Sequence, residues 1–171
     1  RDFKTSYQET GAAIADEKSI SDMECGEGFD RATLTLLGKQ QDLLNALKAT
    51  GKPLIVVYIE GRPLDKVWAS EYADALLIAS YPGQEGGYAI ADVLFGDYNP
   101  AGRLPVSVPR SVGQIPVYYN KKAPCNHDYV EQAASPLYTF GYGLSYTTFE
   151  YKNLHITPDK QGVQGKIEIS M

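Results

Sequence analysis

Between residues 39 and 96, the pattern of apolar and polar positions switches between helical spacing and continuous apolar runs. This pattern predicts helices and strands in turn. Residues 39–50 carry leucines at helical spacing, and Gly51 follows them as a stop signal. The next run, 54–59, is continuously apolar and β-branched, which is typical of a parallel strand covered on both faces. The leucines expected on one face of the helix are Leu43, Leu44 and Leu47.

The same pattern repeats further along the chain. A short helix is expected at about 64–70 and a second buried strand at 75–80. A glycine-rich loop, 81–87, then leads into a helix whose apolar stripe ends at Gly96. Strands that alternate with helices favour right-handed βαβ crossovers. The predicted class is therefore α/β with a mostly parallel sheet.

The second half of the chain has a different character. Residues 104–108 alternate in polarity, with prolines at 105 and 109, which predicts an edge strand or an extended segment. Residues 115–146 are rich in Pro, Tyr, Gly and Asn without a helical period, so we expect ordered surface loops. The stretch 145–171 contains two short β patterns around 158–162, which predict a hairpin.

Composition and charge limit the classes of partner. With 171 residues, 43% of them hydrophobic, the chain is expected to form one core that buries roughly 70% of the unfolded surface. Its net charge is -5 and it has no run of Lys or Arg, so we expect no nucleic-acid partner. No stretch approaches the ~20 apolar residues of a membrane span, so we expect no membrane partner.

The residues that commonly bind metals are few and widely spaced. Cys25 and Cys125 are far apart in sequence, and neither His127 nor His155 has a carboxylate at a ligand interval. We therefore expect neither a metal nor another cofactor. The two cysteines form either a disulfide or two separate thiols, and the spacing does not decide between them.

One carboxylate stands out by its neighbours. Gly26 and Gly28 flank Glu27, and glycine adopts conformations that let the backbone turn sharply and present a side chain from an exposed loop. A solvated glutamate in a glycine-rich turn is the plainer interpretation of these three residues alone. The rest of the chain decides between the two.

Six short motifs follow one another in a fixed order. They are 26–31 (GEGFDR), 50–57 (TGKPLIVV), 61–63 (GRP), 82–87 (PGQEGG), 91–105 (ADVLFGDYNPAGRLP) and 140–146 (FGYGLSY). Each motif is weak by itself. Together, over about residues 25–149, they closely resemble the second domain of family 3 glycoside hydrolases, which are chiefly β-glucosidases and β-xylosidases.

The resemblance implies a fold and a catalytic residue. It implies an (α/β)6-sandwich-like, three-layer domain that works beside a (β/α)8 barrel, with the barrel supplying an Asp nucleophile. In a retaining glycosidase a second carboxyl group protonates the leaving oxygen and later activates water. The resemblance assigns that general acid/base role to Glu27. Glu24 is the competitor, but it lacks the flanking glycines.

The resemblance also predicts the domain boundaries. Residues 1–146 correspond to the sandwich domain, with an incomplete or irregular N-terminal part, because 1–23 supply no convincing buried strand. Residues 147–171 correspond to the beginning of a fibronectin type III-like domain. The chain is then expected to be a fragment of a β-glycosidase that is inactive alone, since it lacks the barrel.

The implied partners follow from that assignment. They are the N-terminal barrel and a β-linked oligosaccharide or an aryl or alkyl glycoside, most often a β-glucoside. The family resemblance favours a periplasmic or secreted location. The alternative function is a non-catalytic, doubly wound module that binds a sugar or an anion. Such a module should not expose a broad apolar patch on the face that bears Glu27.

Other residues near Glu27 keep open interpretations. Asp30 and Arg31 either orient the loop, touch substrate or form an internal pair that stiffens the turn. Phe29 either lines a sugar subsite or anchors the loop. No role is assigned to four aromatic residues in loop-like sequence, namely Tyr118, Tyr119, Phe140 and Tyr142.

Overall fold

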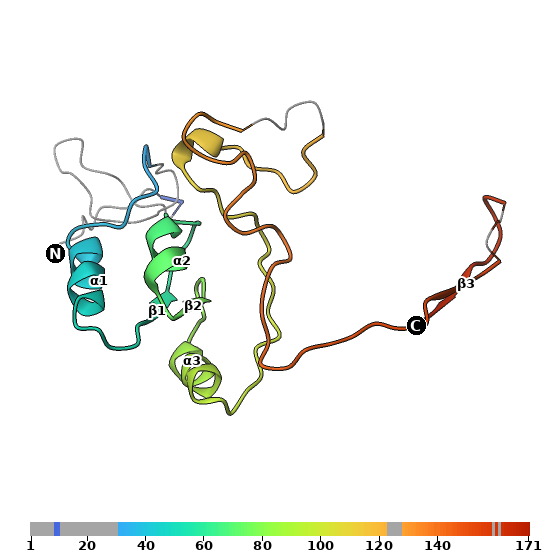
Figure 1. The fold of residues 1–171 in the computed structure, drawn as a ribbon, viewed down its shortest axis with the longest axis horizontal. Helices are drawn as coiled ribbons and strands as arrows, with labels where there is room; N and C mark the ends of the chain where they lie inside the picture. Colours follow the sequence, from blue (N-terminus) through green and yellow to red (C-terminus); the bar gives the residue numbers. More distant parts are fainter. Residues whose placement is uncertain (1–8, 11–30, 123–127, 159, 161) are drawn as a thin grey trace.

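The computed structural model describes residues 9–10, 31–122, 128–158, 160 and 162–171. The elements in these ranges are α1 (Gln40–Lys48), β1 (Ile55–Tyr58), α2 (Val67–Tyr72), β2 (Ala75–Ile78), α3 (Gly86–Phe95), the 3₁₀ helix η1 (Val112–Gln114), β3 (His155–Thr157) and β4 (Glu168–Ser170). β1 and β2 pair in parallel, while β3 and β4 pair antiparallel. The predicted α/β class with a parallel sheet is confirmed (Figure 1).

The parallel pair is the centre of the fold. Ile55 lies opposite Ala75 in the register, and α2 forms the crossover between the two strands. The hydrogen bonding continues beyond the strands, because the Glu60 amide donates to the Ser80 carbonyl at 3.3 Å. The sequence therefore located both strands correctly.

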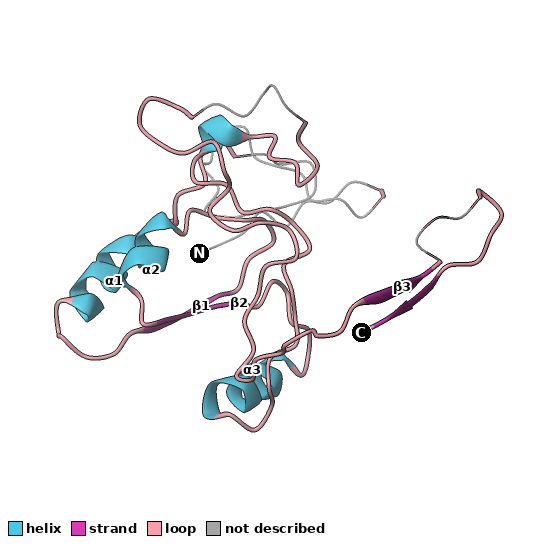
Figure 2. Ribbon diagram, turned by 45° about the vertical axis from the view of Figure 1, so that its right-hand side comes forward, coloured by secondary structure: helices cyan, strands magenta, loops and turns pink. Residues whose placement is uncertain are grey.

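The small core lies on one side of this pair. Val56 and Tyr58 of β1 are buried against Ala69 of α2, and Leu44 of α1 packs against the same cluster. Figure 2 shows α1 and α2 together on one side of the strands and α3 on the other. No helix in the described part of the chain is long and apolar enough to span a bilayer.

The prediction that both strands are covered on both faces was wrong. Ile55 of β1 is 53% exposed, and no residue of β2 is fully buried. The reason lies in α3, where Gly86 alone is buried and the side chains of Tyr88 and Phe95 are 76% and 83% exposed. An apolar run thus indicates what a strand can bury, and the elements around it decide what is buried.

The predicted helices are present with corrected details. Gly51 adopts a φ of +70° just after α1, which confirms it as the stop signal. Leu44 packs against the core, whereas Leu43 and Leu47 are exposed, so the predicted leucine face is only partly used. α2 begins three residues later than Leu64, where the expected helix starts, because the Asp65 carboxylate accepts a hydrogen bond from the Val67 amide at 2.9 Å.

The exposed area contradicts the expectation of one large core. The chain exposes 13502 Å², whereas a compact monomer of 18.8 kDa exposes about 8300 Å². Its unfolded surface is about 27000 Å², so folding buries roughly half of that surface and not the expected 70%. The core cluster of the described residues is small, with Leu54, Val56, Tyr58 and Ala69 buried in it.

Two extended segments, 104–108 and 138–142, join the later loops to the rest of the fold and are called the arms. The Leu104 amide donates to the Tyr142 carbonyl at 2.9 Å, and the Val108 amide donates to the Tyr138 carbonyl at 2.8 Å. Figure 1 shows these arms running beside one another away from α3. Residues 104–108 therefore form the predicted extended segment, paired at Val108 by an isolated antiparallel bridge.

The C-terminal hairpin is also as predicted. Ile156 of β3 lies opposite Ile169 of β4, and all residues of both strands are exposed. Figures 1 and 2 both show the hairpin set apart from the helices. Its assignment to a fibronectin type III-like domain stays a prediction.

The start of α3 provides a test of packing. A Cβ atom at Gly86 would lie 2.5 Å from Cγ of Pro82, whereas a Cβ at Gly87 would meet nothing within 4 Å. We expect Gly86→Ala to lower the free energy of unfolding by about 1–3 kcal/mol, because the stiff proline ring cannot move aside. The matched variant Gly87→Ala should raise it by about 0.5–1 kcal/mol, since alanine favours helix. Urea unfolding measures both, and equal effects would contradict this account of the loop.

Candidate functional site

Open α/β sheets bind ligands at the carboxyl ends of their parallel strands. Here the loops that follow β1 and β2 lie at that end. Glu27 lies outside the described residues, as do Glu24, Phe29 and Asp30. The nearest described neighbour in sequence is Arg31. The described part of the site therefore begins at Arg31.

The segment 31–36 lies against the loop after β1. The Asp65 amide donates a 2.7 Å hydrogen bond to the Leu34 carbonyl, and Leu36 packs against the core. Arg31 donates from Nη2 to the Thr35 carbonyl at 2.7 Å, so it stiffens this segment. Its Nη1 is buried and has no hydrogen-bond acceptor within the described part of the chain.

A buried ion pair closes the loop after β1. Nζ of Lys66 lies 2.6 Å from Oε1 and 2.8 Å from Oε2 of Glu60, and the two residues are 0% and 5% exposed. The Leu64 amide donates to the same carboxylate, and Nζ of Lys66 donates to the Leu64 carbonyl. Both charges are thus paired and hydrogen-bonded, which buried charges require.

Tyr58 forms the floor beneath this pair. Nζ of Lys66 lies 4.6 Å from the centre of its ring, a distance suited to a cation–π contact. Its hydroxyl donates to the Asp65 carbonyl at 3.4 Å. Burial, together with the negative charges of Glu60 and Asp65, raises the pKa of Tyr58 to about 12.

The loop after β2 is turned by residues with positive φ. Ser80 and Gly83 have φ of 51° and 77°, and α3 begins at Gly86. Two large side chains near the strand ends, Ile59 and Tyr81, are exposed. The carboxyl end of the sheet therefore presents apolar surface beside the ordered loop that holds Glu60.

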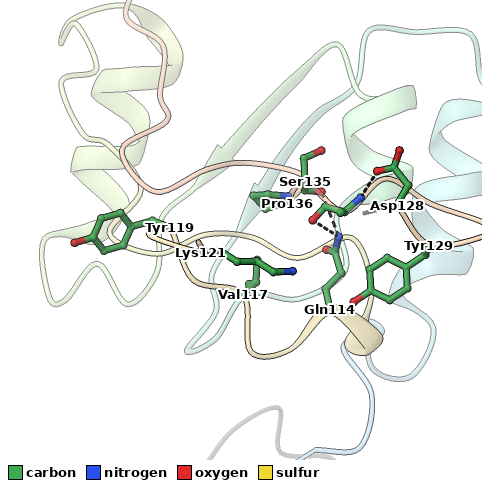
Figure 3. A pocket seen from close by; sticks show the side chains of 9 residues that line it. Gln114, Val117, Tyr119, Lys121, Asp128, Tyr129, Ser135 and Pro136 are labelled. Atoms are coloured by element: carbon green, nitrogen blue, oxygen red, sulfur yellow. Dashed lines mark hydrogen bonds between the residues drawn. The ribbon is translucent and has the colours of Figure 1, made fainter. Parts of the chain in front are cut away.

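A cavity of about 360 Å³ lies among the later loops. Figure 3 shows it between the chain that follows η1 and the returning arm. Its lining residues are Gln114, Val117, Tyr119, Lys121, Asp128, Tyr129, Ala134, Ser135 and Pro136.

Hydrogen bonds within the chain hold the walls of this cavity together. The Gln114 amide nitrogen donates to the Ala133 carbonyl at 2.9 Å, and its oxygen accepts from the Arg110 amide at 2.6 Å. The Asp128 carboxylate accepts from the Ala134 amide, as the dashed line in Figure 3 shows. These groups serve to join two arms of the loop region, which lack regular pairing there.

Three of the four aromatic residues left without a role belong to stacked ring pairs. The rings of Tyr119 and Phe140 stack with centres 4.9 Å apart, and those of Tyr138 and Tyr142 stack at 5.1 Å. Tyr118 is exposed. These contacts support the arms and do not by themselves form a sugar subsite.

The described residues contain no group of three or more His, Cys, Asp or Glu side chains that could hold a metal ion. Cys25, Cys125 and His127 lie outside the described residues. Sequence reasoning missed the pairing of Glu60 with Lys66. The only signal in the sequence was that Glu60 and Lys66 flank the turn 61–63. Neither helical nor strand periodicity places these two side chains together, so the sequence did not predict the pair.

Comparison with known proteins gives one family. The model of the glycosyl hydrolase family 3 C-terminal domain matches residues 6–146. The periplasmic beta-glucosidase of Salmonella typhimurium is 49% identical over an alignment of 156 residues, and the match covers 85% of this chain and 20% of the relative. A beta-xylosidase of Formosa agariphila is 47% identical over 131 residues, 74% of this chain and 18% of the relative.

A solved structure agrees with these relatives. A β-glucosidase from Erythrobacter marinus is similar with a TM-score of 0.76 and 45% identity, over 82% of this chain and 19% of that protein. The chain therefore spans about a fifth of the length of the relatives that it matches.

The raised pKa of Tyr58 predicts a pH dependence of stability. The unfolded chain ionises this phenol near its ordinary pKa of 10.0, whereas the folded chain keeps the proton up to about 12. Between these values the folded state binds more protons, so the contribution of Tyr58 is complete below pH 10 and is lost as the pH rises towards 12. Tyr58→Phe should make the fall in the free energy of unfolding shallower in this window.

Urea unfolding across the window measures that slope. Tyr118→Phe is the matched control, because Tyr118 is exposed, and it should leave the slope as in the unchanged chain. A slope that Tyr58→Phe leaves unaltered would contradict the burial of this phenol.

Proposed function

Because the chain belongs to glycoside hydrolase family 3 through its C-terminal domain, we propose that it supplies that domain to a retaining β-glycosidase. The observation that carries the proposal is the family match over residues 6–146, which includes the βαβ unit and the loops at its carboxyl end. The reaction is hydrolysis of a terminal, non-reducing β-D-glycosidic bond. A β-glucoside is the proposed substrate, and a β-xyloside is the rival, since relatives carry both names.

In this proposal Glu27 is the general acid/base. It protonates the leaving oxygen while a carboxylate of the barrel attacks the anomeric carbon, and it then deprotonates the water that releases the sugar. In a retaining enzyme the nucleophile and the acid/base are two carboxyl groups about 5–5.5 Å apart. Glu27 alone cannot fill both roles. The support is the motif at 26–31 and the position of the following segment, 31–36, at the carboxyl end of β1.

The proposed architecture extends beyond the described sheet. Residues 1–146 belong to a three-layer α/β sandwich domain of the (α/β)6 type, and 147–171 begin a fibronectin type III-like domain. The partly exposed face of β1 and β2 supports the first assignment, because parallel sheets are normally covered on both faces. The exposed hairpin supports the second, because two strands alone are marginally stable in water.

A barrel domain is the proposed protein partner. Among the described residues, large apolar side chains are exposed at the ends of both parallel strands and on α3, including Ile59, Tyr81, Tyr88 and Phe95. Large apolar side chains that are exposed together are typical of a surface that another domain covers. The alternative function, a self-sufficient sugar- or anion-binding module, should not expose a broad apolar patch on the face that bears Glu27, and Glu27 lies outside the described residues.

The assignment of Glu27 is tested by substitution in a polypeptide that joins this chain to a family 3 barrel. Glu27→Gln should lower kcat/KM for an alkyl β-glucoside by about 10²- to 10⁴-fold, because its leaving group needs a proton. A dinitrophenyl β-glucoside, whose leaving group does not, should lose far less, and azide should restore its turnover. Glu24→Gln is the matched control and should be nearly unchanged. If Glu24→Gln shows the loss and the azide rescue, the role belongs to Glu24.

The chain by itself should not hydrolyse an aryl β-glucoside. General acid/base catalysis contributes about 10²- to 10⁴-fold, and the nucleophile and the positioning of substrate supply the rest of the rate. A purified sample should therefore release no aglycone above the level of Glu27→Gln. Robust turnover that Glu27→Gln abolishes would show that no barrel is required.

A further inference from the structure

The buried pair of Glu60 and Lys66 has a place in the fold that stability alone does not explain. A buried ion pair contributes little net stability, because desolvation of the two charges offsets their attraction. Its better attested role is to fix one arrangement of the chain. The arrangement fixed here is the loop 60–66, directly after β1.

The pair fixes this loop from both of its ends. Glu60 continues the hydrogen bonding of β1 to the chain after β2, so its backbone is held by the sheet. Lys66 immediately precedes α2, so its backbone is held by the helix. The peptide between Leu64 and Asp65 is then held by the pair, since Leu64 donates its amide to Glu60 and its carbonyl accepts from Lys66.

The fixed peptide holds the segment 31–36. The Asp65 amide donates to the Leu34 carbonyl at 2.7 Å, while the Asp65 carbonyl accepts from the Tyr58 hydroxyl. Arg31 stiffens the same segment through its bond to Thr35. The position of this segment therefore depends on a loop that one buried pair closes.

We propose that the Glu60–Lys66 pair is a positioning device for the general acid/base. Glu27 precedes Arg31 by four positions, so the segment that the pair holds comes soon after the proposed acid/base along the sequence. This inference rests on the proposed function. Neither Glu60 nor Lys66 touches substrate in the proposal; they act through Asp65 and Leu34.

If the pair positions the acid, the loss of rate on substitution depends on the leaving group of the substrate. If the pair only stabilises the fold, the loss does not depend on the leaving group. A displaced acid fails to protonate a poor leaving group, whereas a good leaving group departs without it. A loss of folded protein, in contrast, lowers the rates with both substrates by the same factor. The ratio of kcat/KM for the two substrates therefore separates the two roles.

The experiment uses the same barrel-containing polypeptide and the same two glucosides. Glu60→Gln should lower kcat/KM for the alkyl β-glucoside by about 10- to 100-fold and for the dinitrophenyl β-glucoside by less than about 3-fold. Glu60→Asp, which keeps the charge but shortens the side chain, should show the same selectivity with a smaller loss. The control is Asp42→Asn, which breaks the exposed pair of Lys39 and Asp42 and should change neither rate.

A measurement on this chain alone keeps the inference testable if a substituted enzyme folds poorly. Amide hydrogen exchange should speed up at Asp65 in Glu60→Asp, while amides within α1 keep their rates. Equal losses on both substrates, or exchange at Asp65 that matches the unchanged chain, would overturn the inference. If Glu27→Gln shows no dependence on the leaving group, the proposed function fails, and that result is distinct from a failure of Glu60→Gln alone.

Discussion

The parallel pairing of β1 and β2 is the constraint on which the rest of this structure depends. Parallel strands require a crossover, which α2 provides, and that crossover brings the ends of both strands to the same edge. The loops that contain Glu60 and Tyr81 are therefore neighbours although they lie about twenty positions apart. The segment 31–36 joins this edge through Asp65, so three parts of the chain meet there.

Apolar burial explains one side of this pair and not the other. Val56 and Tyr58 pack against α1 and α2, which gives the chain its core. Among the described elements, α3 lies on the opposite side, and its Tyr88 and Phe95 remain exposed. The chain matches about a fifth of the length of its relatives.

Polar interactions organise the regions that apolar packing leaves free. The loop after β1 is held by the buried pair of Glu60 and Lys66, and the later loops are held by Gln114. Both cases place a charged or amide side chain at the centre of several backbone groups that have no regular partner. Loops that are held in this way can keep a defined shape.

The sequence by itself determined the family, both parallel strands, α1 with its stop at Gly51, and the C-terminal hairpin. These features depend on local signals, namely apolar runs, glycine positions and motif order. Only the tertiary structure decided that Ile55 is exposed and that Lys66 is buried against Glu60. Burial and charge pairing depend on which segments meet in space, and a linear pattern of residue types does not contain that information.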